Sequence, residues 1–532
     1  MSNPTRHKSG IGPTDYSGSA MSFQNKKRTV MFMAMLLLWL VVVITVSTKH
    51  EVWRDEVRAL SIALEPSWFW QLPTTLKNEG HPILWYLILR AGFSVTHTPV
   101  ILKVASICVA LGAVIVFFRY APFPVWQKSL FLWGMFPSYY YSVMARNYGI
   151  SMFLFFLFSS FYNRRKETPF LLACVLFALA NTNVHSCILV GVLSVLWFWD
   201  ELVITRGFLN TYRVIILSSA FALVGIGILG AIATSLPTHE TILTEAFSLN
   251  TSEVLQALWM NMKHPGTHFG NVLPGFTVLQ RDVLIWMLIT GLLIQPMVAV
   301  GLFVGTVFLG LFFTTVFPGR VYHQGIFIVF LISLYWIVRQ EQQTIKTRGK
   351  LRQHLHLAHN VTVYGVLSAI LSFHMILSIY QIRVDLFEDM SASRAFGEFL
   401  VTRPEYRETI IMGEPDYLLE SLPYYAPNRI YIPRERRFGN RVMFTQASKE
   451  RLALSELLCI GQEVRKNEKK PVLIALGHFD LSKYPGCELR YSYNKIFTVS
   501  FGELTKFRDE TVKIAEFKSA VLDEKYEIFR LR

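Results

Sequence analysis

The sequence predicts an all-α polytopic membrane protein with about eleven transmembrane helices, followed by a small C-terminal α/β soluble domain. The chain has 532 residues, of which 52% are hydrophobic and 17% charged, and its mean hydropathy is +0.36. Several apolar runs, such as VMFMAMLLLWLVVVITVS and LSSAFALVGIGILGAIATSL, reach the ~20 residues that cross a bilayer core. Residues 383–532 lack such runs and contain strand-like segments instead.

The N-terminal residues 1–28 are polar, rich in Ser and Gly, and end in Lys26, Lys27 and Arg28. This composition predicts a disordered cytoplasmic segment. A basic end before an apolar stretch is also typical of a signal peptide, but the stretch is long, contains Trp39 and lacks a clear A-x-A site. We therefore expect an uncleaved first span. The formal charge of +15 is attributed to cytoplasmic loops, not to nucleic-acid binding.

Eleven crossing segments are expected, at 29–48, 100–118, 127–145, 147–163, 168–182, 184–199, 213–236, 282–297, 298–317, 321–338 and 361–382. The apolar segment 81–95 is short and carries Arg90, so we expect an interfacial helix there. Segments 168–199 and 283–317 are expected to be hairpins. A single helix over 283–317 would be ~50 Å long, too long for a ~30 Å core.

The basic residues support this topology. If Lys26–Arg28 lie in the cytoplasm, every later basic cluster between spans also falls there, as the positive-inside rule requires. These clusters are Arg119 with Lys128, Arg164–Lys166, Arg206 with Arg213, and the group Arg339, Lys346, Arg348, Lys350 and Arg352. The expected domains are then a cytoplasmic N-terminus (1–28), a transmembrane domain (29–382) with outer loops 49–99 and 237–281, and an extracytoplasmic α/β domain (383–532).

Within the C-terminal domain, TIIMGEPD, NRIYIP and PVLIALGHF are typical of short strands. The segment SKERLALSELLCIGQEVRK predicts an amphipathic helix that begins at Ser448. Cys459 and Cys487 also lie in this domain, and whether they form a disulfide stays open. The spacing of the five cysteines is not that of a metal site.

The expected topology collects polar side chains on the outer face, namely Asp55, Glu56, His81, Arg146, Tyr148, His185, Arg320 and His323. Each has an ordinary explanation alone: Asp55 could pair with Arg58 on a solvated helix, and Arg146 could snorkel. Together they suggest chemistry, because ionisable residues near span ends are costly unless they function or reach water. A carboxylate can act as a general base, and Arg binds phosphate oxygens. No nucleotide-binding domain is evident, so the expected donor is a lipid phosphate.

These motifs resemble the GT-C superfamily of integral-membrane glycosyltransferases, which use polyprenyl-phosphate sugars. The acidic pair Asp55-Glu56 after the first span, G-H-P at His81, and A-R-x-Y with Arg146 and Tyr148 are similar to the protein O-mannosyltransferase and aminoarabinose transferase branch. The resemblance covers about residues 30–340. Two motifs depart from the family pattern: Ile83 follows where H-P-P is common, and two residues separate Arg320 from His323 in GRVYHQG.

The resemblance implies a role for each matched residue. Asp55 corresponds to the catalytic base, and Glu56 to a second acid that positions the acceptor. Arg146 and Tyr148 match the pattern near the donor phosphate, and Arg320 with His323 would form a second phosphate contact. His81 and His185 are expected to contact substrate.

The expected activity is an inverting hexosyl or pentosyl transfer from a polyprenyl-phosphate sugar to an extracytoplasmic lipid, glycan or protein acceptor. The enzyme would lie in the bacterial inner membrane, contribute to the cell envelope, and need no cofactor. His264 and His268 could bind a metal, but we favour a lid in loop 237–281. The main alternative is a transporter or flippase; others are a sensor protein and an O-antigen-ligase-like or oligosaccharyl-type enzyme.

Overall fold

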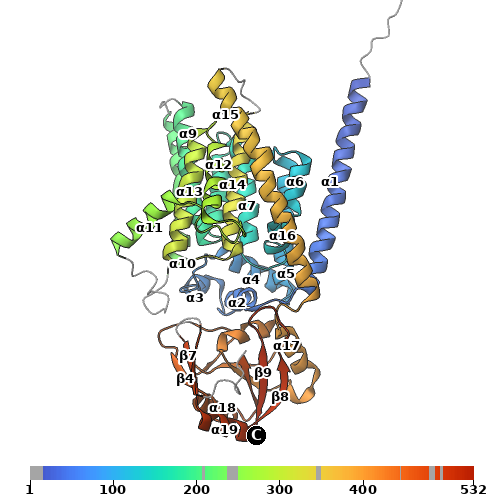
Figure 1. Cartoon of the computed structure of the whole chain (residues 1–532), viewed down its shortest axis with the longest axis vertical. Helices are drawn as coiled ribbons and strands as arrows, with labels where there is room; N and C mark the ends of the chain where they lie inside the picture. The colour runs from blue at the N-terminus through green and yellow to red at the C-terminus, as the bar shows by residue number, and fades with distance from the viewer. Residues whose placement is uncertain are drawn as a thin grey trace, which may run out of the picture.

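The computed structural model describes residues 16–205, 210–236, 250–342, 349–443, 445–477, 486–491 and 495–532. The chain forms a helical bundle with an α/β region at one end (Figure 1). Residues 1–15 of the expected disordered segment, and 237–249 of the expected outer loop with His239, lie outside the described residues.

Seven helices in the described residues are long and apolar enough to cross a membrane, judged by length and composition. They are α1 (Tyr16–Lys49), α5 (Ile101–Tyr120), α9 (Val184–Thr205), α10 (Thr211–Ser235), α13 (Pro296–Thr315), α14 (Val321–Gln342) and the continuous helix Lys350–Phe387. The last consists of α15 (Lys350–Val361), a π-helical turn (Thr362–Leu367) and α16 (Ser368–Phe387). The chain is therefore a multi-pass helical membrane protein.

The other four expected spans contain shorter helices: α6 (Val125–Leu132), α7 (Tyr148–Phe161), α8 (Pro169–Ala180) and α12 (Val278–Thr290). The prediction of one continuous helix over 127–145 was wrong. After α6 the chain passes through a π-helical turn, η2 (Phe136–Tyr140), and then a loop to Asn147. Pro137 lies inside this stretch, and its missing N–H prevents a regular α-helical ladder.

The helix α1 begins at Tyr16, so residues 16–28 are helical and the expected disorder over 1–28 was wrong for that part. No proline follows Pro13 before the apolar run. The hydrogen-bonded ladder of the first span therefore extends backwards through the polar residues at a small cost per residue.

Four short helices lie at the end of the bundle next to the α/β region, and α11 projects from the side of the bundle (Figure 1). They are α2 (Arg54–Leu64), a 3-10 turn (Phe69–Gln71), α3 (Leu72–Thr75), α4 (Leu84–Thr96) and α11 (Thr251–Lys263). The helix α4 has 13 residues and is therefore ~20 Å long. Arg90 on α4 donates hydrogen bonds to the carbonyls of Ala63 and Pro66, which attaches α4 to the end of α2.

The ends of the helices show that successive segments run in alternate directions. At one end, which we call the Arg165 end, Arg165 pairs with Glu341 (2.9 Å) and Arg213 donates to the carbonyl of Lys166 (2.8 Å). At the opposite end, which we call the Asp55 end, the backbone N of Leu84 donates to the carbonyl of Asn181 (3.1 Å). The hairpins expected over 168–199 and 283–317 are both present, turning at 181–183 and 291–295.

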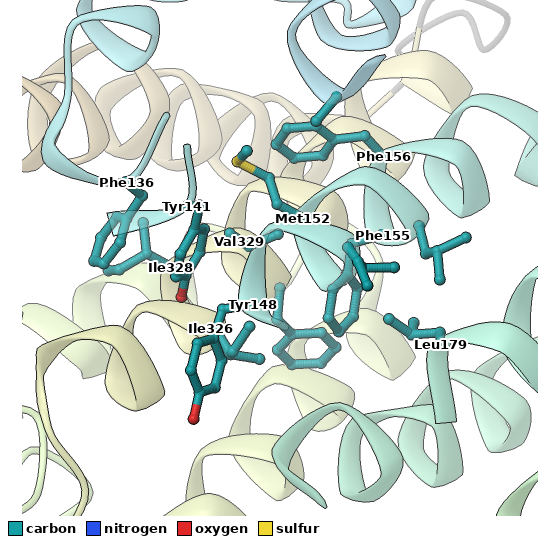
Figure 2. Close-up of a cluster of buried hydrophobic side chains, with 14 of the residues drawn as sticks. Phe136, Tyr141, Tyr148, Met152, Phe155, Phe156, Leu179, Ile326, Ile328 and Val329 are labelled. Atoms are coloured by element: carbon teal, nitrogen blue, oxygen red, sulfur yellow. The ribbon is translucent and has the colours of Figure 1, made fainter. Parts of the chain in front are cut away.

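The centre of the bundle is an aromatic core formed by α7, α14 and η2 (Figure 2). Tyr141 packs between Phe136 (ring centroids 5.1 Å apart) and Tyr148 (6.1 Å), and its hydroxyl donates to the carbonyl of Tyr322 (2.7 Å). Gly325 allows this approach, because a Cβ there would lie 2.6 Å from the Tyr141 hydroxyl. The core thus ends in Tyr148 and Tyr322, which lead into the Asp55 end.

The C-terminal α/β region contains two sheets. The six-stranded sheet has the order β3-β2-β1-β5-β9-β8, and β1 lies parallel to both β2 and β5. Its strands are β1 (Ile410–Glu414), β2 (Ile430–Ile432), β3 (Arg437–Phe438), β5 (Val472–Gly477), β8 (Thr511–Phe517) and β9 (Tyr526–Leu531). The smaller sheet, ordered β4-β7-β6, contains β4 (Arg451–Ala453), β6 (Cys487–Tyr491) and β7 (Lys495–Val499).

Helices cover both faces of the larger sheet. Along β1, Ile410 and Met412 face the core that contains α18 (Leu454–Glu468), whereas Ile411 faces the core of α17 (Ser393–Thr402) and the 3-10 segment η7 (Asp416–Tyr424), as the two-residue period of a strand requires. A further helix, α19 (Phe501–Glu510), packs against α18.

The three predicted strands were found, but the predicted helix begins at Leu454 and not at Ser448, because 451–453 pair with β7. Cys459 is a free, exposed thiol.

Ion pairs attach the α/β region to α2 and the connection that follows it. Arg54 pairs with Asp523 (2.6 Å), Arg58 with Glu420 (2.5 Å) and Arg441 with Glu65 (2.6 Å). The segment η7 also packs directly on α2. The α/β region therefore supports the helix that carries Asp55.

Candidate active site

Asp55 and Glu56 share the first turn of α2, but their surroundings differ. The Asp55 side chain is 35% exposed, and its Oδ2 accepts a hydrogen bond from Arg146 Nη1 at 2.6 Å. Burial raises the pKa of Asp55, but the charges of Arg146 and Arg54 outweigh this effect and hold it below its ordinary value of 3.8. Asp55 is therefore an ionised carboxylate at the open edge of the site.

Glu56 is fully buried, and both of its carboxylate oxygens have partners. Its Oε1 accepts from the backbone N of Ala145 (2.6 Å), and its Oε2 accepts from the backbone N of Trp53 (3.1 Å). The ring of His50 lies 3.1 Å from the same Oε2. Glu56 thus joins the start of α2 to the residue before Arg146.

His50 connects Glu56 to Asp385 on α16. Its Nδ1 lies 2.9 Å from an Asp385 oxygen, and His50 and Asp385 are both buried. Burial lowers the pKa of His50, but the charges of Glu56 and Asp385 outweigh it and raise the pKa to about 10. Both ring nitrogens then donate, and a protonated histidine stands between two carboxylates.

Arg146 is held in position by the hydrogen bonds of its two sequence neighbours and by two tyrosine rings. Its neighbour Asn147 donates to the carbonyl of Thr182 (2.7 Å), while Ala145 bonds to Glu56. The Arg146 guanidinium lies 5.1 Å from the centroid of the Tyr322 ring and 5.8 Å from that of Tyr148, within cation–π range. The cation is therefore fixed in position while one face of Asp55 remains open.

Two histidines, His323 and His185, lie next to these tyrosines. The His323 ring is 5.2 Å from that of Tyr148 and 5.2 Å from that of His185, and its Nδ1 accepts from the backbone N of Arg320 (2.8 Å). His185 is 4% exposed, and neither of its ring nitrogens has a hydrogen-bond partner in the described part of the chain. Buried polar atoms of this kind are rare and need an explanation; a bound polar ligand would provide one.

His81 and Arg320 lie at the margin of this cluster. Burial, together with the charge of Arg146, lowers the pKa of His81 to about 4, so His81 is neutral at pH 7. Arg320 is exposed, and its guanidinium forms no hydrogen bond or ion pair with any residue the structure describes. Arg320 can therefore bind an anion without first breaking an ion pair within the described residues.

The structure thus places Asp55, Arg146, Tyr148, His185 and His323 in one cluster, built from α2, the loop before α7, α9 and α14. Three further residues around this cluster were not predicted from the sequence: Tyr322, His50 and Asp385. Tyr322 lies between the two residues singled out in GRVYHQG, so the motif itself contained the signal. His50 stands next to the acidic pair, but its partner Asp385 is 335 positions away, and no local pattern links them.

His264 and His268, in the loop expected to form a lid, both have partners within the protein. His264 pairs with Asp282 (2.9 Å), and His268 lies 2.8 Å from the Thr314 hydroxyl, so both rings are used to attach this segment to α12 and α13. Across the described residues, no group of three or more His, Cys, Asp or Glu side chains is arranged to hold a metal ion.

One solved structure superposes along nearly the whole chain. It is the crystal structure of ArnT from Cupriavidus metallidurans in the apo state, with 11% sequence identity and a TM-score of 0.48, covering 95% of this chain and 98% of that one. No protein-family model and no curated protein sequence matches the chain. We therefore base the function on the side chains of the site itself.

Proposed function

We propose that this protein is an inverting glycosyltransferase that moves a hexosyl or pentosyl group from a polyprenyl-phosphate donor to an extracytoplasmic acceptor. The observation that carries the proposal is the ion pair between Asp55, a partly exposed carboxylate, and the guanidinium of Arg146. The two side chains are 2.6 Å apart at the end of the membrane bundle. This pair combines the base and the phosphate-binding cation that the reaction needs.

In the resting site, Arg146 keeps Asp55 ionised but a weak base. A donor phosphate competes for the same guanidinium, which withdraws positive charge from Asp55 and raises its basicity. The acceptor O–H or N–H then attacks the anomeric carbon and transfers its proton to Asp55. The bond between the anomeric carbon and the phosphate oxygen breaks, and its electron pair leaves with the polyprenyl phosphate.

The remaining residues serve this step in distinct ways. Arg146 would stabilise the charge that develops on the leaving phosphate, and Arg320, whose guanidinium has no partner in the described residues, would add a second contact to the bound donor phosphate. The unpartnered nitrogens of His185, with His323, Tyr148 and His81 nearby, would bind donor oxygens. Glu56, whose oxygens are fully used, would act as a positioning residue by holding the loop of Arg146.

The distribution of charge supports an extracytoplasmic site. Arg165, Arg213 and Arg339 lie at the opposite end of the bundle from Asp55, and basic residues accumulate on the cytoplasmic side of membrane proteins. The site and the α/β region would then face the periplasm of a bacterial inner membrane. Surrounding membrane lipids, the lipid-linked sugar and the acceptor are the partners that this placement implies.

The test is transfer by the purified protein with defined polyprenyl-phosphate sugars. Asp55→Asn keeps the side-chain volume and should lower kcat by about 10³-fold. The variant should still unfold cooperatively, at a lower temperature, because Arg146 loses its ionised partner. Asp509→Asn, on the exposed face of α19, is the matched control and should retain activity. Full transfer by Asp55→Asn would remove the proposed base.

A further inference from the structure

A cavity of about 580 Å³ lies between α2, the start of α5 and the α/β region. Its walls include Val57, Leu60 and Leu64 from α2, Phe93 from α4, and Tyr424 and Phe438 from the α/β region. Ligand sites in proteins span ~300–1,000 Å³, are mostly apolar, and favour domain interfaces. This cavity has the size, lining and position of such a site.

The cavity is separate from the proposed transfer site. Residues 57, 60 and 64 share one face of α2, whereas Asp55 lies about 140–200° around the same helix at ~100° per residue. The body of α2, with Glu56 and its buried partners, therefore stands between the cavity and the Arg146 guanidinium. A molecule held here is not placed to react with Asp55.

The polar part of the lining contains three arginines, Arg429, Arg437 and Arg441, and one carboxylate, Glu65. Each guanidinium is paired with a carboxylate: Arg441 with Glu65 and Glu79, Arg437 with Glu435, and Arg429 with Glu468. These ion pairs hold the guanidinium groups in position. An apolar wall beside fixed arginines complements a molecule with an apolar chain and an anionic head.

The surface beside the cavity faces the region where lipid is expected. Leu64 is itself 36% exposed, and Val95 and Val100, next to the lining residues Phe93 and Pro99, are 81% and 48% exposed. The aromatic residues 68–70 that follow α2 are exposed as well, and the rings of Trp68 and Trp70 stack 4.9 Å apart. Exposed aromatic residues at the ends of spans are typical of the membrane interface.

We propose that this cavity binds an anionic phospholipid of the surrounding leaflet, with its chain against α2 and its phosphate at Arg437 and Arg441. The inference is independent of the transfer reaction, because the ligand is bound and not consumed. The lipid would brace the junction between the bundle and the α/β region, which is also where Arg441 contacts Glu79.

The experiment titrates the full-length protein, purified in an uncharged maltoside detergent, with pyrene-labelled phosphatidylglycerol. Binding is read as pyrene emission on excitation of the protein's tryptophans. Saturable binding is expected, with phosphatidylcholine carrying the same label binding at least tenfold more weakly. Arg437→Gln and Leu64→Phe should each weaken phosphatidylglycerol binding about tenfold.

The controls are the neighbouring Arg436→Gln, whose side chain is exposed and outside the lining, and Val95→Phe, on the lipid-facing surface. Both should bind like the unmodified protein. The proposal is overturned if Arg437→Gln and Leu64→Phe also bind normally, or if phosphatidylcholine binds as tightly. It is equally overturned if unlabelled polyprenyl phosphate binds and phosphatidylglycerol does not, since the occupant would then be the donor.

Discussion

The two ends of the helical bundle both carry ion pairs, yet they use them differently. At the Arg165 end, Arg165 contacts Asp200 and Glu341, and Arg213 contacts Glu201, so these charges are satisfied within the protein. At the Asp55 end, Arg146 has one carboxylate partner that is still partly exposed, and His185 has no partner in the described residues. Spare hydrogen-bonding capacity, and not the presence of charge, distinguishes the candidate site from a structural cluster.

A matched pair of arginine substitutions, one at each end of the bundle, tests most strongly whether the two ends differ in function. Arg146→Lys should lower kcat by ~10²–10³-fold, because a lysine cannot reproduce the planar contacts to phosphate and to Asp55. Arg165→Lys should lower the unfolding temperature and leave the activity per folded molecule unchanged. Steady-state kinetics and thermal unfolding in detergent measure both effects. Equal kinetic losses in the two variants would mean that the two ends do not differ in function.

The next largest effect is expected at the buried link between Asp385, His50 and Glu56. Asp385→Asn or His50→Gln leaves buried charge without its partner, which costs ~3–5 kcal/mol in the free energy of unfolding. Glu468→Gln, which breaks the exposed pair with Arg429, should cost ~0–1 kcal/mol. Chemical unfolding in mixed micelles provides the comparison, and similar losses for the buried and the exposed pair would contradict it.

The same link predicts a pH dependence. The pKa of His50 is raised from 6.5 to about 10 in the folded protein, so its stabilisation is fully present below pH 6.5 and is lost as the pH rises toward 10. The unfolding temperature of the unmodified protein should therefore fall between pH 7 and pH 10. His50→Gln should show a smaller fall over that range, and an identical profile would exclude His50 as the titrating group.

A smaller effect is expected when two buried histidines, His185 and His374, are each replaced by phenylalanine. His185→Phe removes no hydrogen bond made within the described protein, so stability should be retained while the KM for the donor rises about tenfold. His374 lies 2.8 Å from the carbonyl of Val272, and His374→Phe should cost ~1–3 kcal/mol because that carbonyl loses its partner. An unchanged KM for His185→Phe would remove this residue from the donor site.

The smallest effect is expected at Arg320. Its exposed, unpaired guanidinium should contribute to donor binding by only ~0.2–1 kcal/mol, as other solvated charges do. Arg320→Gln should raise the KM for the donor about threefold with kcat unchanged. A large fall in kcat would instead place Arg320 on the leaving phosphate during transfer.

Sequence reasoning was most successful where the signal is local. The apolar runs, the two hairpins and the strands β1, β2 and β5 follow from hydrophobic periodicity and from Gly, Pro and Asn at the turns. It failed where distant parts of the chain decide: the helix predicted from Ser448 begins later because 451–453 join β7, and the segment after α6 leaves the α-helix around Pro137.

The sequence by itself determined the membrane character of the chain, the alternation of its spans, and the residue types available at each end, because burial of apolar surface and exclusion of charge from lipid act on each segment separately. Only the tertiary structure decided that Asp55 contacts Arg146, that Glu56 is closed off by His50 and Ala145, and that a cavity lies on the far side of α2. Those facts depend on contacts across tens to hundreds of residues, where side-chain packing and desolvation of charge select one arrangement among many.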